Sequence, residues 1–71
     1  MNKKAKKLIN QFYNDVWTYI QAEYDPVWAD LYNSEELLDS MISLTREYYF
    51  GGNTVPNTAG VIVNILKQKY S

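Results

Sequence analysis

The chain has 71 residues, enough for a single helical domain over residues 1–71, and it contains neither cysteine nor histidine. Disulfide bonds are therefore excluded, and the commonest zinc ligands are missing. The net charge is −1, and a content of 46% hydrophobic and 15% aromatic residues favours a packed core over a disordered chain.

The first predicted element is an amphipathic helix from about Lys3 to Tyr24. Apolar side chains recur there at the three- and four-residue spacing of one helical face. They are Ala5, Leu8, Ile9, Phe12, Tyr13, Val16, Tyr19, Ile20 and Tyr24. Because proline disfavours helical geometry in the residue before it, Pro26 should end this helix near Tyr24.

Asp25 and Pro26 predict the start of a short second helix that ends at Tyr32. Aspartate is a good N-cap residue, and proline is favoured at the first helical position. A third helix is predicted to start at Asn33, because this N-cap would place Glu36 at the third helical position and so approximate a capping box.

The pair Gly51-Gly52 is expected to end the third helix, since glycine readily adopts the left-handed conformation of a helix C-cap. Thr54 can cap a last helix with Pro56 in its first turn. Residues 59–70 are open to a second interpretation, because the β-branched run at 61–63 also suits a strand. A strand needs a partner and no other segment resembles one, so we predict a helix.

These elements predict an all-α fold, a small antiparallel helical bundle of three long helices and one short helix. Its charges are segregated along the sequence. Six lysines lie near the two ends, whereas all eight acidic residues lie between Asp15 and Glu47. The ordinary interpretation is solvent-exposed helix ends; the alternative is a basic patch where the two termini meet, able to touch anionic lipid or nucleic acid.

Catalytic groups are scarce. Glu35 and Asp39 are four residues apart and could form an acid–base pair, but acidic residues at a helix start are explained by the helix dipole. Residues 51–54 lack the lysine and the flanking strand of a phosphate loop. We therefore predict that the protein is not an enzyme, with no catalytic residue, no metal and no cofactor.

Eleven aromatic rings are too many for so small a core, so some should reach the surface. They lie either at the core edge with their polar tips in water or in an interface with a partner. The best candidates for an exposed patch are Trp17, Trp28 and Tyr32. Together with the terminal lysines they make up the predicted partner-binding residues: Trp17, Trp28, Tyr32, Lys3, Lys4, Lys67 and Lys69. An exposed patch also leaves a homodimer open.

The predicted location is the cytoplasm. The basic start at Lys3 is not followed by the continuous apolar stretch of a signal peptide, and no apolar run approaches the ~20 residues that span a bilayer. Peripheral membrane contact stays open. A protein partner is favoured over nucleic acid, because the only dense basic run lies at the N-terminus of a chain with a slight negative charge.

The opening residues Met1, Lys3, Ala5 and Lys6 and the run 13–16 resemble the start of the enterocin A-type immunity proteins, which protect bacteria that make pediocin-like bacteriocins. The run Asp25-Pro26 with Trp28 and Asp30-Leu31 is similar to their second-helix start, shifted by about one helical turn. The resemblance covers about the first 31 residues. The chain is shorter than the usual member and is expected to lack its extended C-terminal segment, so no residue role is transferred.

The resemblance implies a cytosolic antiparallel helical bundle that acts on the complex between a bacteriocin and its membrane receptor, a mannose-type sugar transporter. Immunity would then arise from binding, without turnover. The alternative hypothesis is a small phage- or plasmid-encoded inhibitor or regulator that binds a host protein through an aromatic surface.

Overall fold

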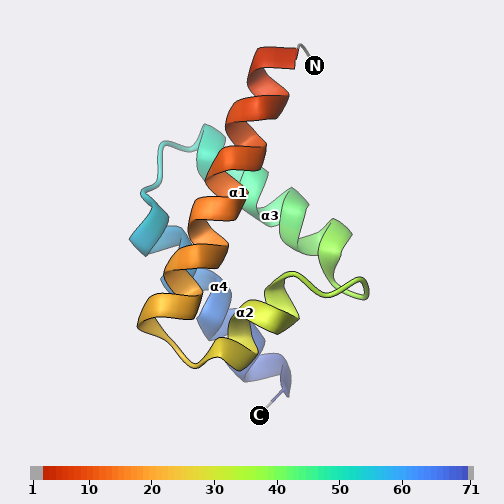
Figure 1. Ribbon diagram of the computed structural model, residues 1–71, viewed down its shortest axis with the longest axis vertical. Coiled ribbons are helices and arrows are strands. Elements are labelled where there is room, and N and C mark those ends of the chain that lie inside the picture. Colours follow the sequence, from red (N-terminus) through yellow and green to blue (C-terminus); the bar gives the residue numbers. More distant parts are fainter. Residues whose placement is uncertain (1–2, 71) are drawn as a thin grey trace.

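The computed structural model describes residues 3–70, which form four helices and no strand (Figure 1). The helices are α1 (Lys3–Glu23), α2 (Pro26–Tyr32), α3 (Leu38–Phe50) and α4 (Val55–Tyr70). The predicted all-α fold with three long helices and one short helix is confirmed. Met1, one of the residues that carry the family resemblance, lies outside the described residues.

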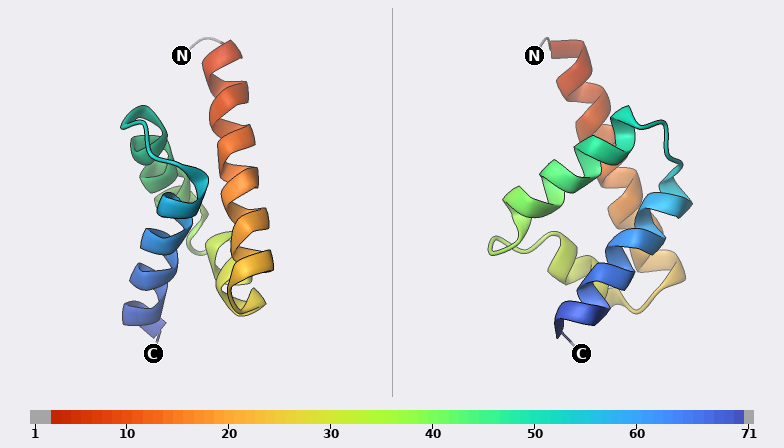
Figure 2. Two further views of the ribbon diagram at one scale, coloured as in Figure 1. Left: turned by 90° about the vertical axis from the view of Figure 1, so that its left-hand side faces the viewer. Right: turned by 180° about the vertical axis from the view of Figure 1, so that it is seen from behind.

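The helix α1 packs against the other three helices. Its buried residues Ile9, Val16 and Ile20 lie on one face, as the apolar spacing predicts. Figures 1 and 2 show α1 and α4 running toward the same end of the molecule, while α3 runs back in the opposite sense. The shared core is formed by Val16, Ile20, Ala29, Tyr32, Leu37, Met41, Ala59, Ile62, Val63 and Leu66.

The predicted start of α2 is confirmed. The Asp25 side chain accepts a hydrogen bond from the Val27 backbone N–H at 3.0 Å, and Pro26 occupies the first turn. The cap satisfies a donor that has no partner inside the helix. It also fixes the reversal between α1 and α2, which places α2 against α1.

The variant Asp25→Ala is expected to lower the free energy of unfolding by about 1 kcal/mol, because the Val27 N–H loses its acceptor. Urea denaturation followed by circular dichroism measures the change. Asp25→Asn is the matched control, since it keeps an acceptor oxygen and should retain most of the stability. An equal loss in both variants would show that the charge matters and the hydrogen bond does not.

The predicted start of α3 at Asn33 is wrong. The helix begins at Leu38, and its N-terminal flank, Leu37, makes no side-chain cap. The Asn33 side chain instead accepts a hydrogen bond from the Tyr13 hydroxyl at 3.2 Å. Residues 35–37 form a turn in which the Leu37 N–H donates to the Ser34 carbonyl at 3.2 Å and lies 3.3 Å from the Ser34 hydroxyl. This turn places the Leu37 side chain in the core, and the third helix therefore begins later in the sequence than predicted.

The ends of α3 and α4 follow the sequence signals. Gly52 has a φ of 78°, a left-handed conformation that glycine adopts without strain, and α3 ends just before it. The Thr54 hydroxyl accepts from the Asn57 N–H at 3.2 Å and so caps α4. The helical interpretation of residues 59–70 is confirmed, since Ile62 and Val63 are buried on one face of α4.

Candidate binding surface

The exposed aromatic patch predicted on the short helix is absent, because Tyr32 is 0% exposed. Its ring stacks on Tyr13 with a centroid distance of 4.4 Å, and its hydroxyl shares a 2.8 Å hydrogen bond with the Thr45 hydroxyl. The whole ring can be buried because its polar tip finds this partner in α3. The prediction that Tyr32 belongs to an exposed patch is therefore wrong, and Tyr32 is a core residue.

Trp17 and Trp28 are half-buried and pack against the core. The Trp17 indole N–H is enclosed and has no hydrogen-bond acceptor among the described residues. The positions of the two tryptophans fit the core-edge interpretation of the aromatic residues better than the interface interpretation.

The alternative interpretation of the charges, a basic patch formed by the two ends of the chain, does not hold for the described residues. Lys3 and Lys4 lie at one end of the molecule, and Lys67 and Lys69 lie at the opposite end (Figures 1 and 2). The reason is that α1 and α4 run in the same sense, so that the start of one helix and the end of the other diverge. All four lysines are exposed, but they form two separate basic clusters.

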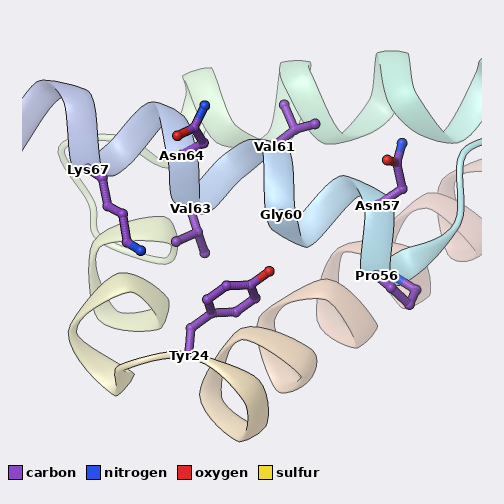
Figure 3. Close-up of a pocket in the computed structure, with 8 residues that line it drawn as sticks. All are labelled: Tyr24, Pro56, Asn57, Gly60, Val61, Val63, Asn64 and Lys67. Atoms are coloured by element: carbon purple, nitrogen blue, oxygen red, sulfur yellow. The ribbon is translucent and has the colours of Figure 1, made fainter.

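A hollow of about 450 Å³ lies where Tyr24 meets α4, and Lys67 is one of its lining residues (Figure 3). A Cβ at Gly60 would lie 3.5 Å from the Tyr24 hydroxyl, which is an ordinary van der Waals contact, so alanine would also fit at this position. Asn57 and Asn64 extend from the side of α4 that faces away from Tyr24. The polar groups around this hollow therefore do not converge on a common point.

A more continuous apolar surface lies at the opposite end, where the first turns of α1 meet the last turns of α3. Leu8 is 42% exposed and Phe50 is 61% exposed. Half-buried rings connect them, since Phe12 lies four residues after Leu8 and contacts Tyr49 at 5.3 Å, and Tyr49 contacts Phe50 at 5.5 Å between centroids. We call Leu8, Phe12, Tyr49 and Phe50 the aromatic ridge.

A groove of about 300 Å³ lies between the same two helices, α1 and α3. Its lining is mainly apolar, with Ile9 and the 39% exposed Ile42 between the helices. Lys6 comes from α1 and Arg46 from α3, and among residues 3–70 no acidic side chain lines the groove. The ridge and the groove together form what we call the N-terminal surface.

The charges of the molecule are polarised along its length. The first turns of α1 and the last turns of α3 carry five cations: Lys3, Lys4, Lys6, Lys7 and Arg46. Glu47 is the one acidic residue in these turns, so their net charge is +4. The acidic residues Glu23, Asp25, Asp30, Glu35, Glu36 and Asp39 lie between the end of α1 and the start of α3. With Lys67 and Lys69 in the last turns of α4 they sum to −4. Asp15 completes the net charge of −1.

No family model matches the chain, and neither the curated proteins nor the solved structures contain a match. Within residues 3–70, no helix combines the length and apolar character needed to cross a membrane. In the same part of the chain, no group of three or more acidic side chains is arranged to hold a metal ion. What the described residues do present is an open, apolar and basic surface.

Proposed function

We propose that the protein acts by binding, without catalysis, and that it protects a bacteriocin-producing cell by binding a bacteriocin–receptor complex from the cytosolic side. The N-terminal resemblance to the enterocin A-type immunity proteins supports the biological setting. The observation that carries the proposal is the exposure of Phe50, 61%, in a domain that buries Tyr32 completely. A large ring left in water beside other apolar groups is typical of a contact surface.

The composition of the N-terminal surface suits a macromolecular partner. The ridge ends at Phe50, the last residue of α3, whose ring is the most exposed of the large apolar side chains among the described residues. Lys6 and Arg46 border the neighbouring groove and supply donors for acidic groups of the partner. An apolar centre with a polar rim is the usual arrangement of a protein interface.

Expression of the chain in a bacteriocin-sensitive strain tests the proposal, and we expect at least a tenfold gain in survival against one or more pediocin-like bacteriocins. Phe50→Ser should abolish most of this gain, because it removes the exposed anchor without opening the core. Val27→Ser is the matched control, since Val27 is 46% exposed and lies on α2, away from the N-terminal surface. No gain across several bacteriocins contradicts the proposal.

The second candidate is a small inhibitor or regulator that binds a soluble host protein. The observation that favours it is the contact chain of rings from Phe12 through Tyr49 to Phe50, because aromatic side chains are enriched at interface hot spots. Capture of partners from a host lysate separates the two candidates, with Phe50→Ser as the negative control. A sugar-transporter subunit supports immunity, whereas a soluble enzyme or repressor supports the inhibitor.

A further inference from the structure

The N-terminal surface combines two features that a protein partner alone does not require. Four exposed lysines, Lys3, Lys4, Lys6 and Lys7, occupy the first turns of α1. The next residue is the exposed Leu8. The exposed Phe50 ends α3, and its ring contacts Tyr49, which in turn contacts Phe12 of α1. Basic side chains beside exposed leucine and phenylalanine are typical of helices that lie at the boundary between lipid headgroups and acyl chains.

We propose that this end of the molecule docks on a bilayer surface that carries anionic lipid. Leu8 and Phe50 would lie at the level of the upper acyl chains, and the lysines would extend their stems along the apolar region and place their ammonium groups among the lipid phosphates. The proposal rests on the proposed function for the choice of surface, and it makes the lipid around the receptor complex a part of the target.

The shape and charge of the molecule favour this orientation. Figure 2 shows that the first turns of α1 extend beyond the other helices, so they can reach a flat surface first. The acidic half lies toward the other end of a molecule that is 37 Å long. Because the Debye length is about 8 Å at physiological salt, that acidic half is screened from a surface touched by the basic end.

The apolar groups distinguish lipid from nucleic acid, the other anionic partner. Bases bind to proteins by stacking on aromatic rings. Leu8 and the groove residue Ile42 are aliphatic, and both are more than one-third exposed. Hydrocarbon chains bury such side chains, whereas a stacked base gains little from them. Charge and apolar character together therefore fit a lipid surface.

Co-sedimentation with vesicles tests the proposal at about 0.1 M salt. Vesicles of phosphatidylcholine with about one-third phosphatidylglycerol are compared with vesicles of phosphatidylcholine alone, and we expect at least tenfold stronger partitioning to the anionic vesicles. The double variant Lys3→Gln/Lys4→Gln should lose about 20- to 30-fold of that partitioning, since each lysine near an anionic surface contributes roughly fivefold. Phe50→Ser should reduce the partitioning to the anionic vesicles by a comparable factor.

The double variant Lys67→Gln/Lys69→Gln is the matched control. It removes the same charge from the opposite end and should bind like the parent chain. Circular dichroism confirms that each variant is folded; all four lysines are exposed, so their replacement leaves the core intact. Equal losses in the two double variants, or equal binding to neutral and anionic vesicles, would overturn the proposal.

Two further outcomes are informative. Tighter binding to duplex DNA than to the anionic vesicles at the same salt would overturn lipid docking in favour of nucleic acid. The vesicles contain no protein, so a negative vesicle result with intact immunity removes the lipid inference alone. Vesicle binding that depends on Lys3 and Lys4, in a chain that gives no survival gain, removes the immunity proposal and supports the docking surface.

Discussion

Replacing Tyr32 with alanine is expected to lower the free energy of unfolding by about 3–5 kcal/mol, enough to leave much of the chain unfolded at 25 °C. Tyr32 is the largest fully buried side chain among the described residues, and it joins three helices. Its ring stacks on Tyr13 of α1, and its hydroxyl bonds to Thr45 of α3. Small domains have little stability to lose. Urea denaturation followed by circular dichroism measures the effect.

The contribution of the buried hydroxyl can be separated from that of the ring. Tyr32→Phe keeps the ring and leaves the Thr45 hydroxyl buried without its partner, so we expect a loss of about 1–3 kcal/mol. Adding Thr45→Val removes the orphaned group, and the double variant should recover part of that loss. A Tyr32→Ala variant with unchanged stability, or strictly additive effects in the pair, would contradict this account of the core.

Local sequence signals predicted most helix boundaries, because the groups that set them are neighbours in the chain. Asp25 and Pro26 start α2 through a bond to the N–H of Val27, two residues away. Gly52 ends α3 through its own backbone conformation, and Thr54 caps α4 through Asn57, three residues away. Each of these contacts forms within one turn and needs no knowledge of the fold.

The errors came from contacts between residues distant in the sequence. Asn33 was predicted to cap α3, but the Tyr13 hydroxyl, 20 residues away, donates to its side chain. Tyr32 was predicted to be exposed, but Thr45 provides a buried partner for its hydroxyl. Periodicity identifies a polar tip on an apolar face; whether that tip reaches water or a partner depends on how the helices cross.

Only part of the N-terminal surface could be predicted from the sequence. The lysines Lys3 and Lys4 were predicted to bind a partner, but Leu8 was assigned to the apolar face of the first helix. The direction of α4 relative to α1 was not predicted either, so Lys67 and Lys69 were assigned to the same patch. The signal that was missed is on α3: Ile42, Arg46 and Phe50 are spaced by four residues and form an exposed stripe beside the buried face. Arg46 is also the one base in the acidic middle of the chain.

The stacked pair Tyr13 and Tyr32 should make the fold sensitive to alkali. Burial raises the pKa of Tyr13 from 10.0 to about 12. Burial also raises the pKa of Tyr32; the hydrogen bond with Thr45 opposes this shift, and the nearby Tyr13 adds to it. In the unfolded chain both hydroxyls titrate near the ordinary tyrosine value. Between pH 10 and pH 12 the unfolded state therefore binds fewer protons than the folded state.

The free energy of unfolding should consequently be constant with respect to these groups below about pH 10 and should fall as the pH rises toward 12. Because Tyr13 is only half-buried and solvent screens its charge, we expect its share of the loss to be about 1–2 kcal/mol at pH 12. Tyr32 is fully buried and adds to this loss. Urea midpoints across this range, with tyrosinate absorbance recorded on the same samples, measure the effect.

Tyr13→Phe provides the control for this pH dependence, because it keeps the ring stack on Tyr32 and removes one titrating hydroxyl. The variant loses the hydrogen bonds from that hydroxyl to the Tyr32 carbonyl and the Asn33 side chain, so it should be less stable at neutral pH. Its stability should nevertheless fall less steeply between pH 10 and pH 12. An identical slope in the two proteins would show that the buried pair does not link proton binding to folding.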